Sequence, residues 1–286
     1  MASIEVSRID YSQYSDRQLA AIPLVVLVLA LGVLGGWYLT TGAPVTPGID
    51  FTGGTEIQVQ TSAPQAEIES TLGAESVAPI GSAANTYIVT FQSTDTEAIT
   101  ERTQQAGYEI QSIQSVSASF GSDTQRLAVI GVLVAFAGMS VLAFLLFRTF
   151  VPSIAIVVSA FSDIVVPLAL MNLFGIELSL GTVAALLMLI GYSVDSDILL
   201  NNHVLRRSGG FYESAYRAMR TGVTMTITSI TAMAVMAIVA SRYVFNIPLM
   251  SEIGIVLVFG LVVDLMNTYL LNMSLLRWYK YEGIAR

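Results

Sequence analysis

Residues 178–202, LSLGTVAALLMLIGYSVDSDILLNN, form an apolar run long enough to cross a membrane, yet Asp195 and Asp197 stand inside it. About 20 mostly apolar residues span ~30 Å of hydrocarbon at ~1.5 Å per residue. A charge at mid-bilayer costs at least ~2.5–3.5 kcal/mol, so acids in such a span usually face a bundle interior or a water path. The run therefore predicts a membrane helix that carries a functional site.

Five further runs of this kind occur in the sequence. The chain has 286 residues, of which 54% are hydrophobic and 12% charged, whereas a soluble domain is about a quarter charged. The first run is too long for a signal peptide and is followed by no convincing cleavage site. We therefore predict an α-helical integral membrane protein with six transmembrane helices, at residues 19–39, 127–147, 152–171, 178–200, 223–241 and 250–271.

The distribution of Lys and Arg predicts the orientation in the cell membrane, since cytoplasmic segments carry more of these residues. The ten on the side of the N-terminus are Arg8, Arg17, Arg148, Arg206, Arg207, Arg217, Arg220, Arg277, Lys280 and Arg286. The opposite side holds Arg102, Arg126 and Arg242. Both termini are therefore predicted to be cytoplasmic. The predicted divisions are a cytoplasmic N-terminus (1–18), transmembrane helix 1 (19–40), an extracytoplasmic domain (41–126), transmembrane helices 2–6 (127–273) and a cytoplasmic C-terminus (274–286).

The long segment 41–126 predicts a folded domain between the first two spans. Alternating or β-branched residues indicate strands at 55–61, 76–80, 85–91 and 108–120, and capped patterns indicate helices at 62–73 and 93–107. A turn at Gly81-Ser82 would join the two middle strands. The order β-α-β-β-α-β is that of a ferredoxin-like α+β domain, and about 75 residues can bury a small core. A short amphipathic helix is also predicted at 212–220, before the fifth span.

The composition excludes several kinds of site. The chain has no cysteine and one histidine, so neither a thiolate metal site nor a histidine cluster can form. The glycines of GIDFTGGTEI (48–57) lack the Gly-Lys-Ser/Thr of a phosphate-binding loop and predict a sharp bend instead. A net charge of −8 leaves no basic face for nucleic acid and, with Arg in place of Lys, is typical of a salt-adapted surface. We expect no catalytic residue, cofactor or metal.

Four acids lie inside predicted spans, namely Asp163, Asp195, Asp197 and Asp264, with Arg220 at the cytoplasmic mouth of the fifth span. Burial raises the pKa of a carboxyl group, so buried acids can exchange protons near neutral pH. The alternative is a structural hydrogen bond between helices, worth ~0.6 kcal/mol on average. Four acids on three spans favour an ion or proton path. Asp195 and Asp197 are ~200° apart around a helix, so both can line one path only if the helix unwinds.

Three segments together resemble the SecF family of protein-export membrane proteins. GIDFTGGT (48–55) matches a hallmark that this family shares with SecD, LGTVAALLMLIGYSVDSDILL (180–200) resembles the fourth-span pattern, and RAMRTGVTMTITS (217–229) resembles the approach to the fifth span. The motif residues that open the outer domain are Gly48, Ile49, Asp50, Phe51, Gly53 and Gly54. In the fourth span, Asp195 stands at the family's Asn and Ser196 at its Asp, while Asp195 matches the Asp of a SecD motif. This departure indicates an archaeal-type member, and it favours Asp195 over Asp197 as the titrating acid.

The resemblance implies a function and partners. Such proteins join SecD in an accessory complex of the Sec translocon, and the two resemble halves of a resistance-nodulation-division (RND) transporter bundle driven by the proton-motive force. The implied relay comprises Asp195, Asp197, Asp163, Arg220 and Asp264. The implied partners are SecD, the translocon channel, the translocating polypeptide and the lipid bilayer. The alternatives are a half-size RND-like exporter of lipids or small molecules, and a non-energised scaffold for SecD or the translocon.

Overall fold

Six helices of the computed structural model are long and apolar enough to cross a membrane. The structure describes residues 11–79, 85–206, 210–241, 244–245 and 247–283. The long helices are α1 (Asp16–Thr41), α5 (Ala118–Phe147), α6 (Phe150–Phe174), α7 (Leu180–Arg206), α8 (Phe211–Ala240) and α9 (Pro248–Met266). Each coincides with one predicted span, so the prediction of a multi-pass helical membrane protein is confirmed. The predicted Gly81-Ser82 turn and the charges Arg8, Arg207, Arg242 and Arg286 lie outside the described residues.

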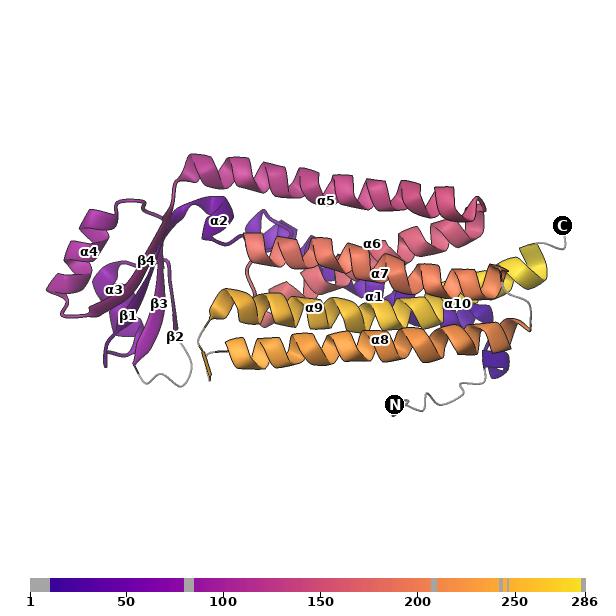
Figure 1. Cartoon of the computed structure of the whole chain (residues 1–286). Coiled ribbons are helices and arrows are strands. Elements are labelled where there is room, and N and C mark those ends of the chain that lie inside the picture. The colour runs from indigo at the N-terminus through magenta and orange to yellow at the C-terminus, as the bar shows by residue number, and fades with distance from the viewer. Residues whose placement is uncertain (1–10, 80–84, 207–209, 242–243, 246, 284–286) are drawn as a thin grey trace.

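The last span extends well beyond its apolar window. Helix α9 continues without a break through the π-helical η2 (Asn267–Asn272), α10 (Met273–Trp278) and the π-helical η3 (Tyr279–Gly283). At the other end of the chain, a short 3-10 helix η1 (Tyr11–Gln13) precedes α1. Figure 1 shows η1 and η3 at the end of the bundle that lies away from the sheet. The two described ends of the chain therefore lie on the same side of the bundle.

Two helix boundaries differ from the prediction. Helix α5 begins nine residues before the apolar window, because Ser117 caps its N-terminus by accepting a hydrogen bond from Phe120 N (3.3 Å). The residues predicted as a short helix at 212–220 are helical, but they form the first turns of α8 rather than a helix separate from the fifth span. Nothing in the sequence after Arg220 breaks the helix, and its buried Phe211 and Met219 pack in one cluster with residues of α7 and α10.

The segment between α1 and α5 folds into a small sheet domain (Figure 1). Its elements are β1 (Gly54–Gln60), α3 (Gln65–Leu72), β2 (Ser76–Pro79), β3 (Thr86–Phe91), α4 (Thr96–Gln105) and β4 (Glu109–Val116). The predicted order of strands and helices is thus confirmed. All neighbouring strands are antiparallel, in the order β2-β3-β1-β4. Alternate residues of β1, Ile57 and Val59, are fully buried beneath Ile68 and Leu72 of α3, which explains the period-two pattern of this strand.

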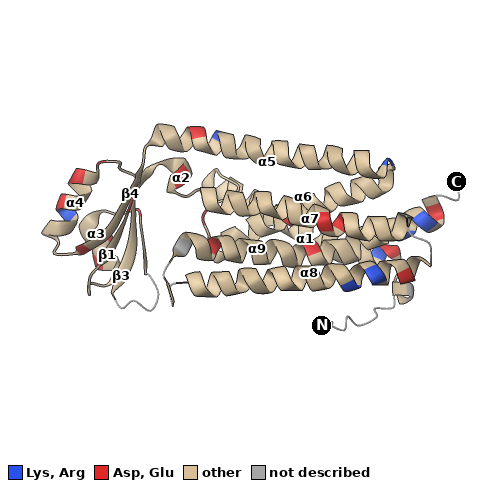
Figure 2. Cartoon of the chain, in the orientation of Figure 1, with Lys and Arg blue, Asp and Glu red and all other residues tan. Residues whose placement is uncertain are grey.

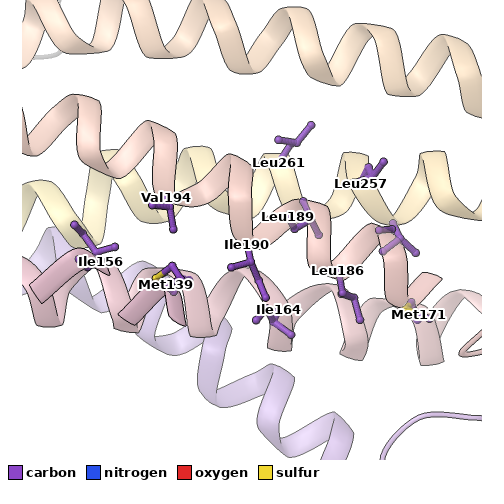
Figure 3. Close-up of a cluster of buried hydrophobic side chains, with 14 of the residues drawn as sticks. Met139, Ile156, Ile164, Met171, Leu186, Leu189, Ile190, Val194, Leu257 and Leu261 are labelled. Carbon is purple, nitrogen blue, oxygen red and sulfur yellow. The ribbon is translucent and has the colours of Figure 1, made fainter. Parts of the chain in front are cut away.

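Helix α7 lies in the centre of the bundle, against α5, α6, α8 and α9. Leu186, Leu189 and Ile190 on one side of α7 pack in the cluster that also holds Leu257 of α9 and Ile164 of α6 (Figure 3). The opposite side of α7 is exposed, and its exposed residues are Ala184, Leu187, Met188, Gly191 and Asp195. Charged side chains are sparse along the middle of the bundle, where they include acids on α7 (Figure 2). The packing therefore fixes which face of α7 points inward.

Candidate functional site

Three of the four acids predicted inside the spans lie together in the interior of the bundle. Asp163 of α6, Asp197 of α7 and Asp264 of α9 are 1%, 0% and 2% exposed, and we call them the acid cluster. The ion pairs that the described residues form all lie outside this cluster. The acid cluster thus places three carboxyl groups where an unpaired charge is costly.

Asp163 is held by donors from two other spans. Ser193 Oγ on α7 donates to Asp163 Oδ2 at 2.6 Å. Asn267 Nδ2 in η2 donates to Asp163 Oδ1 at 2.6 Å. The side chain of Asp163 therefore links α6 to both α7 and the last span through short hydrogen bonds.

The other two acids share a hydroxyl group. Thr268 Oγ1 lies 3.0 Å from Asp197 Oδ1 and 3.4 Å from Asp264 Oδ1, and it donates to one or the other. Asn272 Nδ2 also donates to Asp197 Oδ1, at 2.8 Å, and Ser196 Oγ donates to Asp264 Oδ1 at 2.9 Å. A hydroxyl group both donates and accepts a proton, so a bridging Thr268 provides the kind of link along which a proton can pass.

These donors were not among the predicted site residues, although a spacing in the sequence marks them. SAFSD (159–163) and SVDSD (193–197) both place Ser, Ser and Asp at positions i, i+3 and i+4, and DLMNT (264–268) places Asp, Asn and Thr in the same way. Such residues share one face of a helix. The π-helical turn of η2 adds Asn272, five residues after Asn267, to that face. π-Helical turns occur often at functional sites.

Three buried acceptor atoms in the acid cluster and on the Asn side chains that bind it lack a hydrogen-bond partner among the described residues. They are Asp197 Oδ2, Asn267 Oδ1 and Asn272 Oδ1. Buried polar atoms are nearly always hydrogen-bonded, so each exception needs a reason. Acceptors suit a proton-bearing group or a small cation rather than an anion. Within the described part of the chain, however, no three Asp, Glu or His side chains converge as a metal site requires.

Asp195 stands apart from the acid cluster. Helix α7 does not unwind, so Asp195 points away from Asp197 and is exposed on the outside of the bundle. It lines a groove of about 400 Å³ between α7 and α8, together with Asn202, His203 and Thr221. The sequence favoured Asp195 as the titrating acid, whereas the structure places Asp197 with the other two buried acids. The reason is packing: the Ser193–Asp197 face of α7, not the Asp195 face, meets α6 and α9.

Arg220 is likewise outside the acid cluster. It lies exposed on α8 beside Thr221, and thus next to the groove that Asp195 lines. Among the described acids none forms an ion pair with it. Of the five predicted relay residues, the structure therefore brings together three and leaves Asp195 and Arg220 at the surface.

The motif GIDFTGG forms the predicted bend. Gly48 precedes a single helical turn, α2 (Ile49–Thr52), in which Phe51 is 3% exposed. Gly53 and Gly54 follow with φ of 74° and 131°, values that favour glycine. The bend leads directly into β1, so the motif joins the helix bundle to the sheet domain.

The comparisons with known proteins agree with this arrangement. Residues 38–65 match the family model described as SecD/SecF GG Motif, and residues 95–282 match Protein export membrane protein SecD/SecF, C-terminal. The chain is 65% identical over 291 residues to Protein-export membrane protein SecF of Haloferax volcanii, and 63% identical over 294 residues to that of Haloquadratum walsbyi, with 100% of both chains covered in each case. The chain is 38% identical over 278 residues to Protein-export membrane protein SecF of Methanocaldococcus jannaschii, and the match covers 93% of this chain and 96% of the relative.

Proposed function

The chain belongs to the SecD/SecF family of protein-export membrane proteins, and we propose that it is the SecF subunit of a SecD–SecF complex that assists polypeptide export through the Sec translocon. In this proposal the complex uses the proton-motive force, and the chain itself catalyses no covalent chemistry. Its partners are SecD, the translocon channel and the translocating polypeptide. Its similarity to SecF proteins from halophilic archaea fits a net charge of −8.

The acid cluster carries this proposal. Three carboxyl groups from α6, α7 and α9 lie in the interior of the helix bundle, and each is hydrogen-bonded to a residue of another helix. A proton that binds there removes a buried charge, and its release restores that charge, so the preferred packing of these helices depends on the protonation state. Moving one charge through 100 mV is worth ~2.3 kcal/mol, which changes a two-state equilibrium about fiftyfold.

The exposed face of α7 supports a SecD partner. Asp195 would meet lipid on this face if the chain stood alone, at a cost of at least ~2.5–3.5 kcal/mol. The neighbouring face of α8 exposes Thr221 and Thr228, whose hydroxyl groups bond back to the carbonyl oxygens of Arg217 and Thr224. A polar face inside a membrane span is typical of a helix that packs against other protein. A second six-helix half would cover it.

We further propose that the sheet domain is a ferredoxin-like domain on the extracytoplasmic side. Two observations support this assignment. The β-α-β-β-α-β order with antiparallel neighbours is that of the ferredoxin-like fold. The described chain ends lie at the other end of the bundle (Figure 1), on the side that carries more Lys and Arg.

An export assay in cells that lack the natural gene tests the proposal. We expect Asp163→Asn, Asp197→Asn or Asp264→Asn to reduce export of a secreted reporter while the variant still co-purifies with SecD. Asp123→Asn, the same change at an exposed position of α5, is the matched control and should export normally. Normal export by all three cluster variants, singly and combined, would favour the non-energised scaffold. A stable homodimer that transports a lipid or small molecule in vesicles, without SecD, would favour the half-size exporter.

A further inference from the structure

Asp50 of the GIDFTGG motif bonds to the beginning of the central helix α7. Leu180 N, at the first residue of α7, donates to Asp50 Oδ2 at 3.0 Å across a separation of 130 residues. The first N–H groups of a helix lack partners within the helix, and a carboxylate there also meets the positive end of the helix dipole. Asp50 therefore acts as a distant cap for α7.

Backbone hydrogen bonds reinforce this contact. Gly48 N donates to Leu178 O, and Leu178 N donates to Thr46 O, both at 2.8 Å. Pro47 and Leu178 form a short parallel bridge. A Cβ at Gly48 would lie 3.1 Å from Glu177 Oε2 and 3.2 Å from Leu178 O, so the two segments approach closely at this glycine. Residues 46–50 and residues 178–180 are thus held together by three hydrogen bonds, two between backbone atoms and one from Leu180 N to Asp50.

The other side of α2 is wedged against α5 and the sheet. A Cβ at Gly121 of α5 would come within 2.8 Å of Phe51 O and 2.9 Å of Gly53 N. β1 starts at Gly54, which pairs with Val116, the last residue of β4. Only Gly53 separates α2 from β1, so a displacement of α2 moves the start of β1.

Helix α7 connects this contact to the acid cluster. It is unbroken from Leu180 to Arg206. Ser193 lies 13 residues from Leu180, which corresponds to about 20 Å along a straight helix. Ser193 and Asp197 hold one part of α7 in the acid cluster, while Asp50 holds its beginning at the outer end of the bundle.

From this geometry we infer that Asp50 is a positioning residue that transmits movement of α7 from the acid cluster to the outer sheet domain. The inference rests on the proposed function only in that the acid cluster changes its protonation during export. Residues Gly48–Gly54, which we call the joint, then convert a shift or tilt of α7 into a movement of β1. Without the Asp50 cap, only the backbone contacts of Thr46 and Gly48 with Leu178 remain, and the sheet domain follows α7 less closely.

A single reporter cysteine tests the joint, since the chain has no cysteine of its own. Gln58→Cys places the thiol on β1, and its labelling rate is measured with a membrane-permeant reagent in membranes that contain the full-length chain and its natural partners. We expect Asp197→Asn to change this rate by about threefold or more, as a change in local opening does. In an Asp50→Ala background the response to Asp197→Asn should be clearly smaller, because the side-chain contact to α7 is gone and only the backbone contacts remain. In Asp50→Asn, which keeps an acceptor for Leu180 N, the response should persist.

Asp95→Ala is the matched control. Asp95 caps α4 inside the sheet domain by accepting a hydrogen bond from Ala98 N at 3.1 Å, so its loss removes a similar cap without touching α7. The response should persist in this variant. The inference is overturned if Asp197→Asn leaves the labelling rate of the reporter unchanged in the parent, if the response is undiminished in Asp50→Ala, or if Asp95→Ala reduces it equally. Export by Asp197→Asn alone decides the proposed function, so the two failures are distinguishable.

Discussion

Asp195 and Asp197 stand two positions apart on α7 and lie in opposite environments: Asp197 is fully buried in the acid cluster, whereas Asp195 is exposed beside α8. The same helix thus presents one carboxyl group to the interior of the bundle and one to a surface groove. Because the surroundings of the two groups differ, the same Asp→Asn change should have different consequences at each.

We expect Asp197→Asn to abolish most export assistance and leave assembly with SecD intact. Asn keeps the size of Asp and one acceptor for Thr268 and Asn272, but it cannot release a proton. Asp195→Asn should instead weaken co-purification with SecD, because in the proposed complex this face packs against SecD, and loss of the charge makes its exposure to lipid less costly. Export and co-purification, measured on both variants in one strain, check this division. The opposite pattern would assign the relay to Asp195.

Much of this architecture follows from the sequence by simple periodicity. Apolar windows located all six spans, and alternation located the strands, because each depends on neighbouring residues only. The inward face of α7 could not be predicted in the same way. In a membrane both faces of a helix are apolar, so hydropathy does not reveal which one packs. The contact between Asp50 and Leu180 joins positions 130 residues apart, and no local pattern encodes it.

Gly121→Ala should destabilise the chain even though alanine usually stabilises a helix by ~1 kcal/mol relative to glycine. A Cβ at this position would lie under 3 Å from the backbone of Phe51 and Gly53, and backbone atoms cannot rotate away. We expect a loss of ~1–3 kcal/mol, typical of overpacking. Gly138→Ala on the same helix meets nothing within 4 Å and is the control. Thermal unfolding of both variants in one detergent measures the difference, and equal midpoints would contradict the tight contact.

The raised pKa of Glu177 predicts how the stability of the chain depends on pH. Burial raises the pKa of Glu177 above its ordinary value of 4.5, and the charges of Glu56 and Glu75 add to the effect. A carboxyl group with a higher pKa in the folded than in the unfolded chain holds its proton more tightly when folded. Stability therefore falls as the pH rises from 4.5 through the raised value.

Glu177→Gln should consequently stabilise the chain at pH 7.5, and the gain should disappear below pH 4.5, where both forms are neutral. Unfolding midpoints at a series of pH values measure this. Glu67→Gln, an exposed change on α3, is the control and should alter the midpoint little at any pH. A Glu177→Gln variant that is less stable than the parent at pH 7.5 would show that the carboxylate form is favoured instead.

Single cysteines should report the orientation of the chain. Glu97 on α4 and Glu282 in η3 are both exposed and lie at opposite ends of the molecule. The excess of Lys and Arg at the η3 end predicts that this end is cytoplasmic. A membrane-impermeant thiol reagent should therefore label Glu97→Cys in intact cells and label Glu282→Cys only after lysis. Labelling of Glu282→Cys in intact cells would contradict the predicted orientation and place the η3 end outside the cell.

Among the Lys and Arg side chains that the structure describes, Arg277 should contribute most to stability. It is 8% exposed and binds the start of the chain through three contacts: its Nε donates to Asp16, its Nη1 to Tyr11 O at 2.6 Å, and its Nη2 to Tyr14 O at 2.7 Å. Arg277→Ala leaves these acceptors without a partner and should cost about 3 kcal/mol. The planar guanidinium group makes all three contacts at once, so Arg277→Lys should recover only part of the loss.

The matched control is Arg217→Ala, which breaks the exposed ion pair with Glu213 one turn away on α8. Exposed pairs of this spacing are worth ~0.3–0.5 kcal/mol, because water already solvates both groups. Unfolding midpoints should therefore fall in the order Arg217→Ala, Arg277→Lys, Arg277→Ala, with the smallest loss first. Each alanine variant removes one guanidinium group that is paired with one carboxylate, but Arg277 is buried and also donates to two carbonyl oxygens, so its loss should cost more. Equal losses for the two alanine variants would mean that the N-terminal segment is held by the packing of Tyr11 in the cluster with Met219 rather than by Arg277.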